Sequence, residues 1–506
     1  MSPQDAATHD ERHESVDEGA RTPSSAVVRD AAAVVAVKAL TTAAVLAGGF
    51  TAISDDDYAR VVTALRFADA PALDPTGTSW LPLPFWIYGG ALAVFGSDLG
   101  VARACAFVLG VLAAGLVWAA ARLLDLSRRA AVVGATLAAV FPYSAYLGAA
   151  TVPEAPTAAL TLFGAATVAS DARMRLLGAL ALGAASAARY EPWAAAAAFA
   201  AITGWDALRS RDPRLVAATG LALAFPAAWL LHGIVRHGDA LFFVERVASY
   251  RAALGPDDPW LERLIRTPRA FVTSEPELVL GTLGLFLVAP RGLLARERRA
   301  LTKSGSVLVA IVLLAVLGDL LGGAPTHHGE RALLAVWSWL ALVAGALATR
   351  IGEIQLARRS LAAITLVATI AVGAGVIRRR WPRAPFTERI AEIDIGKRAR
   401  ARSIDRLAID APDFGYFAIQ AAFGRPRDTR VLDARDPREP RSRDLLVESP
   451  PGLRRFLLTR GYRWLAVPTS RVERARQIGS VRELNDRWAL IELAHAEAPR
   501  GLDPSP

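Results

Sequence analysis

The sequence contains very little cysteine and lysine. Cys105 is its single cysteine, so no internal disulfide can form and cysteine usage says nothing about the redox compartment. Lysine occurs only at Lys38, Lys303 and Lys397, and arginine supplies the rest of the 58 basic residues. We find no internal repeat, no phosphate-cradling glycine loop and no CxxC pattern. The sequence therefore lacks the usual signatures of solenoids, P-loop nucleotide-binding proteins and cysteine-based metal sites.

Apolar residues, in contrast, are abundant and occur in long blocks. Of the 506 residues 53% are hydrophobic, and the mean hydropathy is +0.31, which is too apolar for an ordinary soluble protein. The net charge of +10 is uneven, because residues 378–506 hold 27 Lys and Arg against 18 Asp and Glu. A basic tail can indicate nucleic-acid binding, but an anionic membrane or a phospholipid-linked substrate explains it as well. We expect the lipid bilayer, and no nucleic acid, as a partner.

The N-terminal region predicts an uncleaved first transmembrane span. Residues 1–30 are polar and acidic without the basic cluster of a signal peptide, and we expect them to be cytoplasmic and disordered. Residues 31–53 are apolar and long enough to cross a bilayer core of about 30 Å. Lys38 lies inside this run, where it either snorkels to the surface or faces the other helices. We favour the position facing the other helices.

The rest of the apolar sequence predicts a polytopic helix bundle of about eleven spans, some of them short. The ten further candidates are residues 101–124, 130–150, 155–169, 176–188, 192–204, 215–235, 277–290, 305–321, 331–349 and 360–377. We therefore assign residues 31–377 to a transmembrane domain.

The links between the spans alternate in charge. Five short links are basic, which by the positive-inside rule places them in the cytoplasm; they are residues 125–129, 171–175, 205–214, 291–303 and 350–359. The other links carry acidic residues, histidines and aromatics, and the larger of them are the outer loops 54–100, 233–276 and 322–330. An odd number of spans then puts residues 378–506 outside, in the periplasm of a bacterial inner-membrane protein, although the arginine cluster at 378–380 argues for the opposite side.

Two outer loops and the tail contain further predicted elements. Residues 58–67 and 240–254 have the apolar pattern of helices lying along the interface, and residues 83–95 read as a half-buried juxtamembrane segment. In the tail, residues 406–410, 430–433, 463–467 and 488–493 read as short strands; residues 414–423, 451–460 and 470–478 read as helices. This alternation predicts a small α/β domain.

The strongest functional signal is the acidic triplet Asp55, Asp56 and Asp57, directly after the first span. Charges at this depth are costly unless they serve a water-facing site. Asp also favours helix N-termini, which would explain one of the three more easily than all of them. Tyr58 follows the triplet, and the loop ends in the aromatic and proline-rich residues 80–86.

This segment resembles the first outer loop of the GT-C superfamily of integral-membrane glycosyltransferases, which includes the protein O-mannosyltransferases and the lipid A aminoarabinose transferases. The resemblance implies transfer of a sugar from a polyprenyl-phosphate carrier, with a loop carboxylate as the base that takes the proton of the acceptor hydroxyl. Asp56 is our first candidate for the base and Asp55 the second.

The aromatic part of the loop departs from the family pattern. Aminoarabinose-transferase relatives commonly carry Lys-Pro-Pro where this chain has Trp80, Leu81 and Pro82. The missing lysine means that the contacts to the donor phosphate come from elsewhere or that the donor differs. Trp80 and Trp86 either stack on a sugar or belong to an aromatic belt at the headgroups.

Two further polar breaks match the resemblance. Glu154 opens a span at the place of a short acidic family motif, where it either contacts a sugar or a basic residue or simply favours the start of a helix. Arg189 and Glu191 lie between two apolar spans. Arg189 either holds a phosphate through its planar guanidinium or pairs with Glu191 at the interface.

The loop at 326–334 is the second functional signal, because relatives often carry a His or Arg cluster in their last large outer loop. Arg331 and Glu330 fit contacts to the donor phosphate, and His327 or His328 an acid, a base or a metal ligand. Adjacent histidines do not by themselves make a metal site, because three or four ligands must converge. A divalent metal is therefore allowed but not required.

These observations favour a membrane glycosyltransferase, and the acceptor and the sugar stay open. A lipid or sugar transporter would show paired repeats and charges near span midpoints, but the sequence has no repeat, and Lys38 and Asp319 are its only charges of this kind. A non-catalytic scaffold that presents the α/β tail is the other alternative, because a degenerate transferase would look similar.

Overall fold

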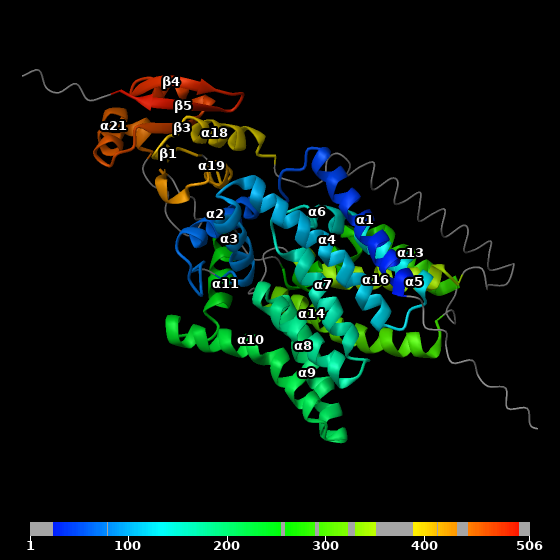
Figure 1. Cartoon of the computed structure of the whole chain (residues 1–506). Coiled ribbons are helices and arrows are strands. Elements are labelled where there is room, and N and C mark those ends of the chain that lie inside the picture. Colours follow the sequence, from blue (N-terminus) through cyan, green and yellow to red (C-terminus); the bar gives the residue numbers. More distant parts are fainter. Residues whose placement is uncertain are drawn as a thin grey trace, which may run out of the picture.

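The computed structural model describes residues 24–77, 79–254, 259–288, 293–321, 329–350, 388–411, 413–432 and 444–494. The predicted span at 360–377, the arginine cluster at 378–380 and the histidine pair His327 and His328 lie outside these residues. The described chain forms a large helical bundle and a small sheet domain attached at one end (Figure 1).

The bundle contains long apolar helices and several shorter ones. The long helices with the composition of membrane spans are α1 (Ser24–Ala47), α4 (Leu99–Leu123), α10 (Pro213–His237) and α14 (Ala295–Leu320). The shorter ones are α5 (Arg128–Val140), α6 (Pro142–Leu147), α7 (Glu154–Thr167), α8 (Ala172–Ala188), α9 (Glu191–Ser210), α15 (Gly329–Ala332) and α16 (Leu334–Ala348). Helices α12 (Trp260–Ser274) and α13 (Pro276–Val288) meet at a bend of 85°.

The predicted count of about eleven spans is not confirmed. All ten predicted spans that fall on described residues are helical, but four helices in this part of the chain are long and apolar enough to cross a membrane, or five with the bent pair. Helix α7, for example, has 14 residues, which at about 1.5 Å per residue covers about 21 Å of a 30 Å core. Several elements are therefore too short to cross alone.

Small residues let the bundle helices approach closely. The core of the bundle is dominated by buried alanines, a packing that is common between membrane helices. Helices α5 and α16 meet where Gly134 lies against Gly345, with no side chain between the two backbones. The alanine-rich runs of the sequence therefore make the helices apolar and also allow them to pack closely against one another.

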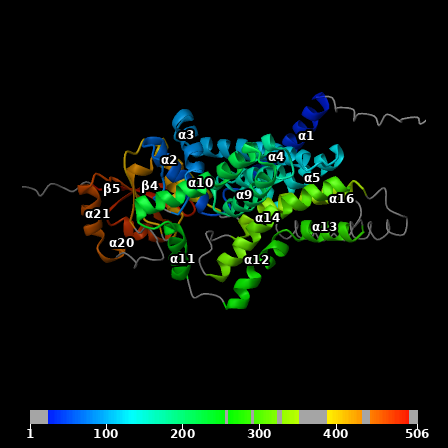
Figure 2. The same ribbon diagram turned by 90° about the horizontal axis from the view of Figure 1, so that it is seen from below.

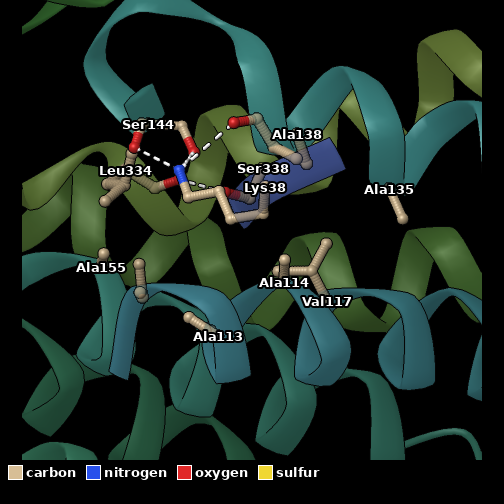
Figure 3. Close-up of a pocket in the computed structure, with 14 residues that line it drawn as sticks. Lys38, Ala113, Ala114, Val117, Ala135, Ala138, Ser144, Ala155, Leu334 and Ser338 are labelled. Atoms are coloured by element: carbon tan, nitrogen blue, oxygen red, sulfur yellow. Dashed lines mark hydrogen bonds between the residues drawn. The ribbon is translucent and has the colours of Figure 1, made fainter. Parts of the chain in front are cut away.

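Lys38 is buried inside the bundle, as predicted, and binds the break between α5 and α6. Its Nζ donates to the carbonyl oxygens of Ala139, at 3.2 Å, and Ser144, at 2.6 Å. Pro142 begins α6 and interrupts the helix ladder there, so the ammonium contacts carbonyl oxygens on both sides of the break. The cavity around Lys38 and Ser144, about 20 Å³ in volume, is lined mostly by alanines (Figure 3) and has room for about one water molecule.

The first outer loop folds into two helices that pack together, α2 (Asp56–Asp69) and α3 (Leu83–Phe95). The buried face of α2 carries Tyr58, Val61, Val62 and Leu65, which contact Phe85 and Tyr88 of α3. The helix predicted at 58–67 is present, and the half-buried segment predicted at 83–95 is helical. A helix is also present at 240–254, as α11 (Phe242–Leu254).

The tail forms the predicted small α/β domain. Its sheet has the strand order β2-β1-β3-β5-β4, parallel over β2, β1 and β3 and antiparallel over the other pairs. The strands are β1 (Leu407–Ile409), β2 (Thr429–Val431), β3 (Trp464–Pro468), β4 (Gly479–Leu484) and β5 (Trp488–Leu493). The sequence predicted every strand except β4.

Helices cover both faces of this sheet. They are α18 (Ile390–Ala401), α19 (Tyr416–Phe423), α20 (Leu445–Glu448), α21 (Pro450–Thr459) and α22 (Val472–Ala475), with short 3₁₀ turns at Pro426–Asp428 and Thr469–Arg471. Alternate residues of the central strands point to opposite faces. Leu407 and Ile409 pack with α18 and α19, whereas Leu465 and Val467 pack with α21. Helices α18 and α20 are two further elements that the sequence did not predict.

The tail domain lies against the first outer loop (Figures 1 and 2). Ala418 and Ala421 of α19 join the hydrophobic cluster of α2 and α3. Two hydrogen bonds add polar contacts to this interface: Arg400 donates to the carbonyl of Ser97, and Arg427 donates to the carbonyl of Arg66. The tail and residues 54–100 therefore share one side of the bundle.

Candidate active site

The beginnings of three helices bring the predicted polar residues together at the end of the bundle nearest the tail. Asp56 is the first residue of α2, Glu154 of α7 and Glu191 of α9. Acidic side chains are favoured at these positions, because the N-terminus of a helix carries partial positive charge. Arg331 comes from the short helix α15.

The three adjacent aspartates have different surroundings, and Asp55 is held by the tail. Both of its carboxylate oxygens accept hydrogen bonds from Arg389, at 2.9 and 3.0 Å. Arg389 also contacts Glu392 and Asp413. Burial lowers the pKa of Arg389, but the hydrogen bond and charge of Asp55 and the charge of Asp413 outweigh it and raise the pKa above its usual range. Asp55 thus anchors the tail domain.

Asp57 is buried and ties the start of α2 to the loop before α7. Its carboxylate accepts from the backbone N–H groups of Ile53 and Thr151, at 3.1 and 2.9 Å. The hydroxyl of Thr151 in turn donates to the carbonyl of Asp57 at 3.0 Å. Burial raises the pKa of Asp57 to about 6, although Arg331 and the backbone donors favour the charged form.

Asp56 is the most open of the three carboxylates. Its side chain is 40% exposed, and its nearest charged partner is Arg331, with 3.7 Å between Oδ2 and Nη1. Among the described residues no side chain or backbone group forms a hydrogen bond with its carboxylate, and the contact with Arg331 is too long for one. Asp56 therefore has lone pairs available toward solvent.

Behind Asp56 lies a buried cluster of acids and arginines. Nη1 of Arg189 is 2.7 Å from Oε1 of Glu154, and its Nε donates to Glu191 at 3.0 Å. The Arg189–Glu191 pair that the sequence allowed is therefore present. Nη1 of Arg331 lies 3.7 Å from both Glu154 and Asp56. Oε2 of Glu154 is buried and has no hydrogen-bond partner in the described structure.

Arg60 belongs to the same site and was missed by the sequence reasoning. It is buried one turn after Asp56 on α2, and its guanidinium lies 4.5 Å from the ring centroid of Trp80. Its Nε and Nη1 have no hydrogen-bond partner in the described structure. The signal was available, since the spacing of four residues puts Arg60 on the same helix face as Asp56.

The aromatic candidates divide between core and surface. Tyr58 is 1% exposed and belongs to the packing between α2 and α3, so it does not face solvent. Trp80 stacks on Phe85, with ring centroids 5.9 Å apart. Trp86 is partly exposed, and its Nε1 donates to the carbonyl of Leu73.

Of the site residues predicted in the second loop, the structure describes Glu330 and Arg331, which lie in α15. The described carboxylates of the cluster face arginines, which leaves them poorly suited to a cation. A different group, Asp74, His232 and His237, brings together atoms that could hold a metal ion.

Comparisons with known proteins agree with this architecture. Residues 75–230 match the model of the dolichyl-phosphate-mannose-protein mannosyltransferase family. The chain is similar to the crystal structure of ArnT from Cupriavidus metallidurans bound to undecaprenyl phosphate, with 13% identity, a TM-score of 0.55, and coverage of 93% of this chain and 98% of that one. The apo structure of the same ArnT gives 12% identity, a TM-score of 0.54, and coverage of 92% and 97%. No curated protein matches the chain.

These findings confirm the resemblance to GT-C glycosyltransferases that the first outer loop indicated. The fold extends over nearly the whole length of ArnT, and the family match covers α3 to α10. Together they support a multi-pass membrane protein and a glycosyltransferase.

Proposed function

We propose that this chain transfers a sugar from a polyprenyl-phosphate carrier to an acceptor hydroxyl at the periplasmic face of a bacterial inner membrane. The single observation that carries the proposal is the convergence of Asp56, Glu154 and Arg331 from three separate helices at one end of the bundle. The undecaprenyl phosphate bound to ArnT supports the donor class.

In the proposed reaction, Asp56 acts as the base. It takes the proton of the acceptor hydroxyl while the acceptor oxygen forms its bond to the anomeric carbon of the sugar. The bond between that carbon and the phosphate oxygen breaks, and the lipid phosphate leaves with the electron pair. Asp56 suits this role because it is more open than Asp55, which binds Arg389, and Asp57, which is buried.

Arginines would stabilise the charge that develops on the leaving phosphate. Arg60 is our first candidate, because two of its nitrogens have no described partner. It also lies beside Trp80, the residue at the place of the family lysine. Arg331 is the second, since its contacts to the carboxylates at 3.7 Å are long. Arg189 already binds two carboxylates and, in this proposal, holds Glu154 in place.

The same cluster disfavours the alternatives. A buried set of charges at one end of the bundle, next to an exposed carboxylate, fits a surface cavity where a lipid headgroup meets a soluble acceptor. A scaffold has no need of a buried guanidinium with two nitrogens that lack hydrogen-bond partners in the described structure, because burying a charge is costly. A transporter would place such groups near the bilayer midplane.

The test is a transfer assay in membrane vesicles with a panel of labelled polyprenyl-phosphate sugars. We expect Asp56→Asn to lower kcat by about 10²- to 10⁴-fold, the usual contribution of a general base. Asp55→Asn should lower kcat much less than Asp56→Asn does. The opposite ranking would make Asp55 the base, and full activity of both variants would remove the acidic loop from the mechanism.

A second pair of variants tests the donor contact. Arg60→Met keeps an unbranched apolar side chain but removes the guanidinium and its charge. We expect a higher KM for the lipid donor and a lower kcat, because the leaving phosphate loses a cation. Arg66→Met on the exposed face of the same helix is the matched control and should leave both constants unchanged. Equal effects of the two substitutions would contradict a specific role of Arg60.

A further inference from the structure

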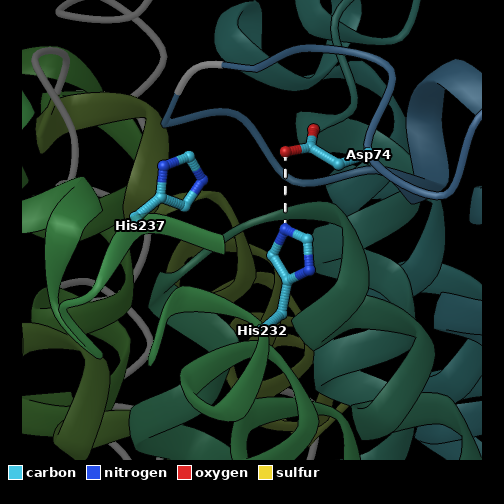
Figure 4. A group of neighbouring side chains, drawn as sticks. All are labelled: Asp74, His232 and His237. Carbon is cyan, nitrogen blue, oxygen red and sulfur yellow. Dashed lines mark ion pairs between the residues drawn. The ribbon is translucent and has the colours of Figure 1, made fainter. Parts of the chain in front are cut away.

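A second polar group lies where the first outer loop meets the end of α10. Asp74 belongs to the loop between α2 and α3, and His232 and His237 belong to the last two turns of α10. Figure 4 shows the Asp74 carboxylate above the ring of His232, with the ring of His237 beside it. The proposed transfer mechanism uses none of these side chains.

The separations fit ligands of a shared ion better than a hydrogen bond. One ligand atom from each residue can be chosen so that all of them lie within 4.8 Å of one another. Nε2 of His232 is 3.6 Å from Oδ2 of Asp74, beyond hydrogen-bond length, and this buried nitrogen has no hydrogen-bond partner in the described structure. Two ligands about 2.1 Å from a tetrahedral zinc ion are about 3.4 Å apart.

The surrounding residues hold the three side chains in place. Oδ1 of Asp74 accepts from the N–H groups of Thr76 and Gly77, at 3.0 and 3.2 Å, which leaves Oδ2 directed at His232. The ring of His232 stacks on Trp229, with centroids 4.8 Å apart.

His237 is positioned by the turn that follows it. Gly238 has a φ of +75°, which ends α10 and reverses the chain. Phe242 can then stack on the ring of His237, with centroids 4.0 Å apart. A site whose ligands are already oriented loses less side-chain entropy when the ion binds.

We propose that Asp74, His232 and His237 bind a divalent transition-metal ion of the zinc class. Two imidazoles and one carboxylate are ligands that zinc accepts, whereas Ca²⁺ and Mg²⁺ prefer oxygen ligands alone. Three protein ligands leave one tetrahedral position for water or another oxygen donor. These three residues are not the histidine pair His327 and His328 at which the sequence allowed a metal.

The ion would tether the outer loop to the bundle. Thr76 hydrogen-bonds through its hydroxyl to both Asp74 and the carbonyl of Trp80, so the loop between these residues is internally connected. Fixing Asp74 on α10 would fix Trp80 as well, and Trp80 contacts Arg60. The binding of the metal does not depend on the proposed glycosyl transfer, and the two can fail independently.

The experiment measures zinc in the full-length protein, purified in detergent through a tag without histidines. After dialysis against a chelator, one equivalent of Zn²⁺ is returned, excess is removed, and bound zinc is counted by mass spectrometry. We expect about one zinc per wild-type chain, as for a single three-ligand site. Asp74→Asn and His232→Gln should each weaken zinc binding by at least about 100-fold in competition with a coloured chelator, as expected when a direct ligand is lost.

The matched control is His327→Gln combined with His328→Gln, which should keep the zinc of the wild type. Visible absorption after Co²⁺ substitution provides a second readout, because tetrahedral Co²⁺ absorbs strongly and loss of a ligand changes its spectrum. Thermal unfolding of the metal-free variants, compared with the metal-free wild type, separates lost binding from lost folding. Zinc that is absent from the wild type, or that disappears only with the His327 and His328 variant, would overturn the proposal.

Discussion

At the scale of single residues, three adjacent carboxylates meet three different environments. Asp55 forms a bidentate contact with Arg389, Asp56 faces solvent and Arg331, and Asp57 is buried among backbone donors. Asp55 precedes α2, and Asp56 and Asp57 are its first two residues, so the three carboxylates point in different directions around the helix start. Chemically identical neighbours can therefore serve as anchor, candidate base and structural clamp.

The buried Asp57 makes a prediction about pH. Burial raises its pKa from 3.8 to about 6, so the folded chain binds more protons than the unfolded chain between about pH 4 and pH 6. The contribution of Asp57 to the free energy of unfolding is therefore largest below about pH 4 and falls as the pH rises, by about 3 kcal/mol in all. Asp57→Asn removes this dependence.

The measurement is the melting temperature of wild type and Asp57→Asn in detergent at several values between about pH 4 and pH 7. The advantage of the wild type over the variant should shrink as the pH rises. Asp69→Asn, at the exposed far end of α2, controls for the loss of one negative charge. A difference between wild type and Asp57→Asn that stays constant over this range would contradict the expectation.

At the scale of elements, small residues decide how the helices pack. A Cβ added at Gly345 would lie 2.5 Å from the Cα of Gly134, closer than real contacts allow. The added Cβ would clash with the backbone of Gly134, which has no side chain that could move aside. The clash can therefore be relieved only by moving α5 away from α16. This pair also forms part of the wall around Lys38, because Ala135 and Ser338 line that cavity.

We expect Gly345→Ala to lower the free energy of unfolding by about 1–3 kcal/mol, the usual cost of overpacking. Gly220→Ala is the matched control, because it lies within α10 with no atom near the added Cβ. It should raise the stability by up to about 1 kcal/mol through helix propensity. Thermal unfolding of the two variants checks this, and a loss of stability in both would contradict the packing argument.

At the scale of the whole molecule, the tail domain and the first outer loop belong to the same side. Arg389 of the tail contacts Asp55, which is 334 residues away in the sequence. The packing of α19 on α2 adds an apolar contact beside this ion pair. The proposed periplasmic position of the tail therefore stands or falls with the position of the loop, independently of the number of spans.

Labelling of single cysteines tests this arrangement. The variants are made in a Cys105→Ala background. In intact spheroplasts, a membrane-impermeant maleimide should label both Leu73→Cys, in the outer loop, and Asp486→Cys, in the tail domain. Arg173→Cys, at an exposed position in a predicted cytoplasmic link, should react only after the membrane is permeabilised. If Asp486→Cys behaved like Arg173→Cys while Leu73→Cys was labelled, the packing of the tail on the loop would be wrong.

The sequence by itself determined the helical class of the chain, the α/β tail and most members of the candidate site. The apolar runs and the alternation of short elements follow from local burial, which the residue pattern records. Asp56 stood out because charge directly after an apolar span is costly unless it serves a water-facing site, whereas Glu154, Arg189 and Arg331 were indicated by the resemblance to the GT-C family. The strand β4 was missed because its exposed and half-buried residues are largely polar.

Only the tertiary structure decided how these parts relate. Asp55 binds the tail domain because Arg389 of the tail donates hydrogen bonds to its carboxylate. Asp57 is buried beneath the loop before α7, where the hydroxyl of Thr151 donates to its carbonyl. Arg60 is assigned to the site because its guanidinium contacts Trp80. Asp74 lies beside His232 because the loop between α2 and α3 packs on α10. Such environments depend on contacts between residues far apart in the chain, which no local pattern encodes, and this is why the sequence indicated the residues but not their roles.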